Sequence, residues 1–382
     1  MELQSKKQSF WSTFKKAYLK SRNLKKIWNK LDKSNLPSEL VETFNLYLNS
    51  ESYSWSAKHW RNNIINHLHL ITNKKNENPN WIISKEYFYF DHFDDSIIDG
   101  LCREVKDKKI NLDINLYKKH NNLSLTESLH YNLVLLLLYE AVKSRDVFNY
   151  LEKLTELELS SEIKKPSLMI NNKKIVQDDL NSLLEFEQIE KLLKNIQKRK
   201  NIILEIGAGS GRTAKTVISI LGNVKYVIAD IPPAINLCIN NLKKYFPNKN
   251  FATAFKLENQ KDLNIALENN DILFIFPHQI KLFANKTFDI VLAIDCLHEM
   301  EKKIIEIYMS IFEQISTLLY FKVWEYSGLN YSFYERHSVH RKSDYSIKNN
   351  WKELLNQRCL YPSKYFELGY ELIEKENKTI IN

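Results

Sequence analysis

The chain has 382 residues, 44% of them hydrophobic, and this length favours two domains over a single one. Its longest aliphatic run, Leu133–Tyr139, is too short to cross a membrane, and the amino terminus is polar and basic rather than an apolar signal sequence. We therefore expect a cytoplasmic protein. The four cysteines are scattered at spacings that do not predict a zinc site, so no metal is expected.

Most of the formal charge of +9 lies in residues 1–33, which carry ten Lys and Arg against Glu2 and Asp32. The apolar residues of this segment recur at roughly helical spacing, which predicts a basic amphipathic helix. Two interpretations stay open: peripheral contact with the inner face of a membrane, or packing on the next helix with the lysines in solvent. Because the excess charge is confined to this segment, we expect no nucleic-acid partner.

Residues 1–165 are predicted to form a mostly helical domain, because apolar residues recur there at helical spacing. The expected helices are Leu40–Leu48, Trp60–Ile71, Ile97–Val105 and Thr126–Val142. Pro166 and an Asn171-Asn172 turn precede a further helix over Asp178–Ile196.

Residues 166–382 are predicted to form an α/β domain, since short apolar strands alternate there with helices, as in a parallel sheet covered on both faces. The expected strands are Ile202–Ile206, Val224–Ala229, Ile272–Phe276, Ile290–Ile294 and Leu318–Val323, with a final hairpin of Tyr370–Ile373 and Thr379–Ile381 after a helix stop at Gly369. The predicted fold class is therefore α/β, a Rossmann-like sheet of about seven strands preceded by a mostly helical domain.

Three of the seven glycines lie within Gly207–Gly211, after the apolar run Ile202–Leu204 and before the helical pattern Arg212–Leu221. Glycine costs conformational entropy on folding and is favoured where positive φ or close backbone approach is needed. The strand, glycine turn and helix therefore predict a ligand near the main chain. The dinucleotide fingerprint needs glycine at position 212, which is arginine here. An NAD-linked oxidoreductase therefore remains only as an alternative.

The pattern from Glu205 to Gly211 resembles motif I of the S-adenosylmethionine-dependent methyltransferases. This resemblance implies S-adenosyl-L-methionine as the cofactor, with Glu205, Gly207, Gly209 and Gly211 in its binding loop. The resemblance thus gives the glycine cluster a specific ligand.

A second acid, Asp230, ends the expected strand 19 residues after Gly211. A carboxylate at this place can accept hydrogen bonds from both ribose hydroxyls of an adenosine. Asp230 can also cap the helix that follows Pro232-Pro233, and the two roles are compatible. We expect Asp230 to bind the ribose.

The segment Phe288–Met300 is an apolar strand whose carboxyl end carries Asp295, His298 and Glu299, at the edge where open α/β sheets bind ligands. It is similar to motif IV of methyltransferases, and its Leu-His-Glu stretch resembles that of small-molecule O-methyltransferases whose histidine deprotonates a hydroxyl. The resemblance implies that Asp295 contacts the cofactor and that His298 is catalytic. Glu299 either orients the histidine or is itself the base.

A narrower resemblance joins Lys174–Phe186, the glycine loop, Tyr226–Ala234 and Glu299-Met300. Together they resemble the sugar O-methyltransferase family of bacterial surface-polysaccharide loci, over roughly residues 165–375, with Asp-Ile-Pro-Pro-Ala as the most specific mark. The resemblance implies methylation of a sugar hydroxyl, free, nucleotide-linked or lipid-linked, in capsule or lipopolysaccharide biosynthesis. It places Gln177, Asp178, Ser182 and Glu185 on a helix flanking the cofactor, Gln177 and Ser182 as cofactor contacts. A scaffold protein with a relict methyltransferase fold is a further alternative.

A basic cluster follows the fifth expected strand, again at the ligand edge of the sheet. Such a cluster can hold a phosphate or a sugar acid, or it can be a solvated loop. The candidate substrate-binding residues are Arg336, His337, His340 and Arg341.

Overall fold

The computed structural model describes residues 24–34, 36–56, 58–73, 95–106, 115–120, 123–146, 148–155, 166–196, 201–326, 340–345, 347 and 350–373. The predictions made for residues 1–23, Arg336, His337 and the strand Thr379–Ile381 lie outside these residues.

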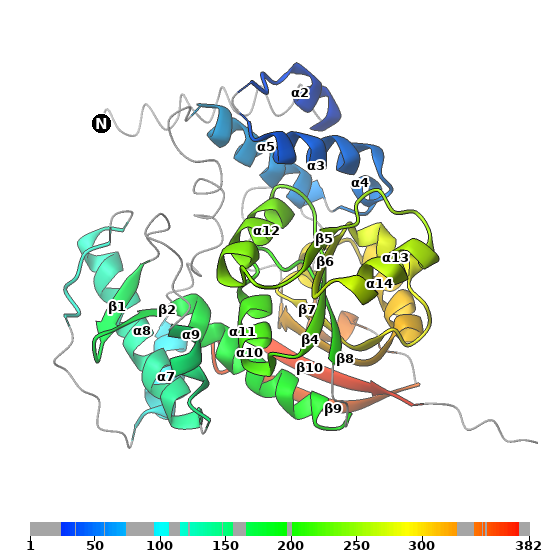
Figure 1. Ribbon diagram of the computed structural model, residues 1–382. Coiled ribbons are helices and arrows are strands. Elements are labelled where there is room, and N and C mark those ends of the chain that lie inside the picture. Colours follow the sequence, from blue (N-terminus) through cyan, green and yellow to red (C-terminus); the bar gives the residue numbers. More distant parts are fainter. Residues whose placement is uncertain are drawn as a thin grey trace, which may run out of the picture.

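The centre of the molecule is a large, mostly parallel sheet (Figure 1). Its strands are β3 (Asn201–Ile206), β4 (Val224–Ala229), β5 (Phe251–Thr253), β6 (Ile272–Ile275), β7 (Phe288–Ile294), β8 (Ser316–Trp324), β9 (Trp351–Arg358) and β10 (Tyr365–Leu372). Their order is β5-β6-β4-β3-β7-β8-β10-β9, with β10 antiparallel to both of its neighbours. The glycine strand β3 thus lies in the middle, between β4 and β7.

Helices cover both faces of this sheet, because alternate side chains of each strand point to opposite sides. The helices are α10 (Gln177–Leu193), α11 (Arg212–Leu221), α12 (Ala234–Tyr245), α13 (Gln260–Asn269), the short 3-10 helix η2 (Pro277–Leu282) and α14 (Lys302–Ile315). One face packs Ile203 and Tyr226 against α10, α11 and α12. The other packs Leu204 and Val227 against α13, η2 and α14. The predicted fold class is confirmed.

The amino-terminal helices form two groups. The first contains α2 (Leu24–Lys30), α3 (Ser38–Asn49), α4 (Ser52–Trp55) and α5 (Lys58–Asn73). The second contains α7 (Asp95–Glu104), α8 (Leu125–Arg145) and α9 (Tyr150–Thr155), with the hairpin β1 (Ser167–Ile170) and β2 (Lys173–Val176). The first group shares a core with Leu237 of α12 and Phe276 after β6, and the second with Leu180 of α10. In Figure 1 the second group, α7 to α9, lies beside α10. The domain boundary expected at residue 165 stays a prediction.

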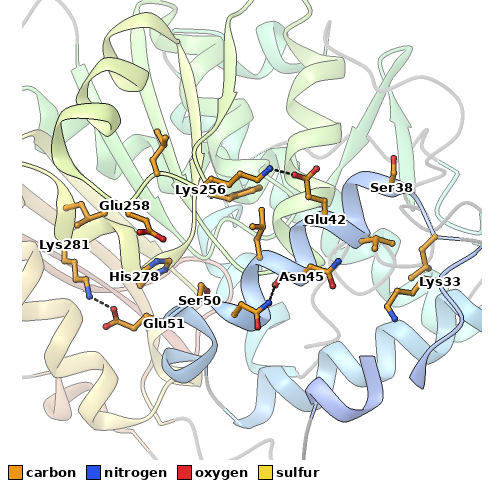
Figure 2. A pocket seen from close by; sticks show the side chains of 17 residues that line it. Lys33, Ser38, Glu42, Asn45, Ser50, Glu51, Lys256, Glu258, His278 and Lys281 are labelled. Atoms are coloured by element: carbon orange, nitrogen blue, oxygen red, sulfur yellow. Dashed lines mark hydrogen bonds and ion pairs between the residues drawn. The ribbon is translucent and has the colours of Figure 1, made fainter. Parts of the chain in front are cut away.

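Polar contacts join the first group of helices to the loops of the sheet. A groove of about 1110 Å³ runs between α3 and the segments after β5 and β6, and two ion pairs lie along it (Figure 2). Lys256 lies 2.7 Å from Glu42, and Lys281 pairs with Glu51. Exposed pairs of this kind contribute little, so the buried apolar contacts set the position of the helices.

The described part of the predicted amphipathic segment packs inward. Leu24 and Trp28 of α2 are buried, and the Trp28 ring stacks on Phe44 at 4.6 Å while its Nε1 donates to Asn45. Trp28 thus packs on α3, and both side chains join the core that α2 shares with α3 and α5, as the packing interpretation expects of them. Within the described residues, no helix combines the length and apolarity needed to span a membrane.

Several strands differ from the sequence prediction. Gly369 does not end a helix; it lies inside β10, in register with Tyr320 of β8 and Leu355 of β9. Strand β9 at the sheet edge is mostly exposed and polar, so it lacks the apolar signal of a buried strand. Strand β5, which the sequence does not predict, has only three residues. The expected Asn171-Asn172 turn connects β1 and β2, a hairpin that the sequence does not predict.

Gly211 caps α11 with φ of +80°, and a Cβ there would lie 2.8 Å from Cys238 Sγ. We expect Gly211→Ala to lower the free energy of unfolding by about 1–3 kcal/mol, because left-handed backbone and crowding both oppose the side chain. Gly100→Ala is the matched control, since Gly100 lies in α7 with open space around it and alanine favours a helix. Urea unfolding measures both; equal stability of Gly211→Ala and the native chain would contradict the argument.

Candidate functional site

The glycine loop after β3 lies against the turn after β7. Gly207 has φ of +70°, and its N–H donates to the carbonyl of Ala229 at 2.9 Å. A Cβ at Gly207 would lie 2.7 Å from Cys296 Cβ, while the Cys296 thiol donates to the carbonyl of Ile206 at 3.2 Å. Only glycine therefore fits at position 207, and the two turns are in direct contact.

Asp230, at the end of β4, holds the glycine loop from the other side. Its Oδ2 accepts from the Gly209 N–H at 2.8 Å, and its Oδ1 accepts from the Ile231 N–H at 2.7 Å. Burial raises the pKa of Asp230 to about 6, and these two hydrogen bonds oppose the rise. Each carboxylate oxygen keeps a second lone pair, so Asp230 can still accept from a ligand.

Glu205 is buried at the end of β3, with 2% of its surface exposed. Its Oε2 accepts from the Tyr226 hydroxyl at 2.8 Å, and burial raises the pKa of Glu205 to about 7. The side chain therefore lies within the helical layer under the loop rather than at an open surface.

A buried charge network ties α10, α11 and β8 together. The Arg212 guanidinium donates to both oxygens of Glu185, at 2.6 and 2.9 Å, and to Ser182 at 3.0 Å. Glu185 also accepts from Lys322 at 3.0 Å and from the Thr213 hydroxyl at 3.2 Å. Although burial alone would raise it, the pKa of Glu185 falls to about 2, because two cations and their hydrogen bonds stabilise the carboxylate. Ser182 is thus engaged in the network.

Asp295 follows β7 with φ of +57°, and its N–H donates to the Lys322 carbonyl at 3.0 Å. Its Oδ2 lies 3.5 Å from Arg212 Nη2, which is an ion pair without a hydrogen bond. Both carboxylate oxygens are buried, and neither has a hydrogen-bond partner within the described part of the chain. Burial raises the pKa of Asp295 to about 6, opposed by Lys322 and Arg212. An acidic group held in this way is suited to receive a donor from a ligand.

Two amides on α10 lie near this network. Gln177 donates to the Tyr361 hydroxyl at 2.6 Å, and its Oε1 lacks a partner among the described residues. Asn181 is fully buried, and neither atom of its amide is hydrogen-bonded within the described chain. Unsatisfied buried amides are costly, so these atoms also indicate a place for polar ligand atoms or water.

Glu299 lies in the short 3-10 helix Leu297–Glu299 after β7 and is half-buried. Its Oε2 accepts from Trp60 Nε1 of α5 at 2.6 Å. Burial raises the pKa of Glu299 to about 8; the Trp60 hydrogen bond opposes the rise, and the charges of Asp295 and Asp230 add to it. Glu299 is therefore a carboxyl group near Asp230 and Asp295, with a pKa close to neutrality.

His298, beside it in sequence, is placed differently. Its ring is 5% exposed and makes edge contacts with Trp324 and Tyr365, at 6.1 and 5.8 Å between centroids. The histidine ring therefore packs against the edges of two aromatic rings, whereas the Glu299 carboxylate accepts a hydrogen bond from the Trp60 indole.

The basic cluster is only partly described. His340 is buried, and its Nε2 lies 2.7 Å from the carbonyl oxygen of Met300. Arg341 is exposed and lies over the ring of Tyr326 at 5.7 Å. The structure thus brings His340 to the end of the 3-10 helix that carries Glu299 and leaves Arg341 at the surface.

Two residues of the site were not singled out from the sequence. Lys322 lies inside the apolar strand β8, and Trp60 lies in an amphipathic helix, so neither carried a local signal. In the sequence, Arg212 is notable only because the dinucleotide fingerprint needs glycine at this position. In the structure its guanidinium donates to Glu185 and forms an ion pair with Asp295.

Part of the chain matches a known family model, described as "Protein of unknown function (DUF938)", over residues 185–323. No characterised protein matches the sequence. Among solved structures, the chain is similar to the PH0226 protein from Pyrococcus horikoshii, with 15% identity and a TM-score of 0.35 over 49% of this chain and 89% of that chain.

The similar structures also include S-adenosylmethionine-dependent methyltransferases. The magnesium protoporphyrin IX methyltransferase of Synechocystis with bound SAH is 10% identical, with a TM-score of 0.36 over 51% of this chain and 86% of that chain. A S-adenosylmethionine-dependent methyltransferase from Clostridium acetobutylicum is 10% identical, with a TM-score of 0.33 over 51% of this chain and 92% of that chain. Similarity of this degree carries no argument about activity, which has to come from the residues of this chain.

We expect Glu185→Ala to lower the free energy of unfolding by about 3–5 kcal/mol, because it leaves two buried cations without their shared partner. Glu187→Ala is the control on the same helix, where the half-buried carboxylate pairs with Arg145 and Lys191 and contributes about 1 kcal/mol or less. Urea titration followed by circular dichroism measures both. Equal losses in the two variants would show that the network is not a stabilising centre.

Proposed function

We propose that the chain is an S-adenosylmethionine-dependent methyltransferase that methylates a hydroxyl oxygen of a sugar. The observation that carries this proposal is the meeting of the glycine loop, Asp230 and Glu299 at the carboxyl ends of three adjacent strands, β4, β3 and β7. Ligands of open α/β sheets bind at that edge, near the point where the strand order reverses.

The residues at this edge fit the cofactor. Asp230 would accept from the ribose hydroxyls through its remaining lone pairs, and the loop at Gly207 to Gly211 would approach the methionine portion. Asp295, whose buried oxygens have no hydrogen bond within the described residues, would accept the ammonium group of that portion. When bound, S-adenosylmethionine supplies the methyl group and leaves as S-adenosylhomocysteine.

Glu299 is the proposed general base. It accepts the proton of the acceptor hydroxyl as the oxygen bonds to the methyl carbon, and a pKa near neutrality suits this task. His298 is the second candidate from the sequence, but the rings of Trp324 and Tyr365 flank it. The choice of Glu299 rests on this difference in surroundings.

The sugar as acceptor is supported by sequence. The Asp-Ile-Pro-Pro-Ala run at 230–234 is the most specific part of the resemblance to sugar O-methyltransferases. In the structure this run connects β4 to α12 and begins with Asp230, the residue proposed to bind the ribose. The pathway we propose is surface-polysaccharide biosynthesis in the cytoplasm.

Calorimetry with S-adenosylhomocysteine tests the cofactor. We expect binding that weakens as the pH falls through about 6, because protonation of Asp230 and Asp295 removes acceptors for the ligand. Asp230→Asn should weaken binding by about 10- to 100-fold. Asp289→Asn is the control, since Asp289 accepts from the Ile202 N–H at the opposite, amino end of the sheet. No binding by the native chain would refute the proposed activity.

Transfer of a radiolabelled methyl group to a panel of nucleotide-linked hexoses tests the chemistry. We expect Glu299→Gln to lower turnover by about 10²- to 10⁴-fold with unchanged affinity for S-adenosylhomocysteine. The native rate should rise with pH up to about 8, because the base works in its deprotonated form. A larger loss in His298→Ala than in Glu299→Gln would move the role to the histidine.

A further inference from the structure

The hydrogen bond between Trp60 and Glu299 joins residues 239 positions apart in the chain. Trp60 lies near the start of α5, in the first group of amino-terminal helices, and its indole N–H is a donor with no acceptor function. Glu299 ends the 3-10 helix after β7. One side chain of the helical region therefore reaches the proposed base directly.

The preceding helix α4 makes its own contacts with elements that cover the sheet, independently of Trp60. The Ser52 hydroxyl bonds to His278 Nδ1 at 2.8 Å and accepts from the His278 N–H at 2.9 Å. Trp55 is buried and packs edge-on against Tyr308 of α14 at 5.6 Å. The residues that make these contacts lie only a few positions before Trp60. The Trp60 indole therefore follows directly on a segment that is fixed in place.

Two carboxyl groups of the sheet raise the pKa of Glu299: Asp295 from the turn after β7 and Asp230 from the end of β4. The Cys296 thiol of the same turn is uncharged, because burial raises its pKa well above the ordinary value. Asp295 and Asp230 disfavour a negative charge on Glu299, while the Trp60 N–H favours it. Without the Trp60 N–H, the Glu299 carboxylate would lie near the acids that follow β4 and β7 without this compensating hydrogen bond.

We propose that Trp60 is a positioning residue for Glu299: its indole N–H orients the carboxylate and stabilises its charged form, so that α5 completes the acceptor side of the site. This inference rests on the proposed function, because it gives Glu299 the role of base. The bonded Oε2 is held by the indole, and Oε1 is left to face the acceptor hydroxyl. The amino-terminal helices thereby become part of the reacting centre.

The ¹⁵N–¹H indole signals of the seven tryptophans allow a test that needs no acceptor. The signal lost in Trp60→Phe identifies Trp60. In the native chain this signal should move with pH around a midpoint near 8, because its partner changes from acid to carboxylate. In Glu299→Gln the Trp60 signal should no longer titrate. Trp28→Phe is the matched control: it removes the indole N–H of α2, in the same helical group, that donates to Asn45, and should leave the Trp60 titration unchanged.

Methyl transfer gives the second readout. Loss of the donor raises the pKa of Glu299, so Trp60→Phe should lower kcat/KM by about 3- to 10-fold at pH 7 and restore much of it near pH 9. Trp28→Phe should keep the native pH profile. A merely structural role of Trp60 would lower the rate equally at every pH.

The outcomes separate the two proposals. Failure of the native chain to bind S-adenosylhomocysteine overturns the proposed function. Full activity of Glu299→Gln leaves methyl transfer in place but overturns the role of Glu299 as base, and this inference with it. A Trp60 signal that does not respond to Glu299→Gln, or a native pH profile in Trp60→Phe, overturns this inference alone. If Trp60→Phe does not fold, the titration in the native chain and its loss in Glu299→Gln still decide the matter.

Discussion

The rest of the structure depends on one buried carboxylate, that of Glu185. It lies on α10, the helix that leads into the sheet, and it accepts from Arg212 at the start of α11 and from Lys322 within β8. Burying one acid with two bases is unfavourable unless every charge is paired, so the three elements have to meet in one geometry. This geometry also sets Arg212 beside Asp295, in the turn that follows β7.

Local signals in the sequence account for most of the sheet and for part of the site. Strands β3, β4, β6, β7 and β8 are continuous apolar runs, and the glycines after β3 mark a turn that needs positive φ. Edge strand β9 is not predicted by the sequence because its exposed side chains are polar. Of its neighbour β10 only the end, from Tyr370, is predicted as a strand, and Gly369 is wrongly predicted to end a helix. A buried apolar run is visible in sequence, whereas a strand defined only by its partner is not.

The site shows the same division. Glu205 and Asp230 follow apolar strands, so their place at the carboxyl edge could be read from the pattern. The partners of Glu185 and Glu299 could not be predicted in this way, because Lys322 lies 137 positions from Glu185 and Trp60 lies 239 positions from Glu299. Such pairs are created by tertiary packing, and a single sequence contains no local trace of them. The sequence alone therefore does not predict which partners raise or lower the pKa of each acid.

The contact between Gly207 and Cys296 has a consequence for how this fold can change. It joins the turn that would hold the cofactor to the turn that would carry the base, through two strands that are neighbours in the sheet. The separation of these two turns is therefore independent of the surrounding surface loops, which tolerate changes in length and composition. Under the proposed function, acceptor preference could diverge in descendants of this chain while the distance between the cofactor loop and the base is inherited unchanged.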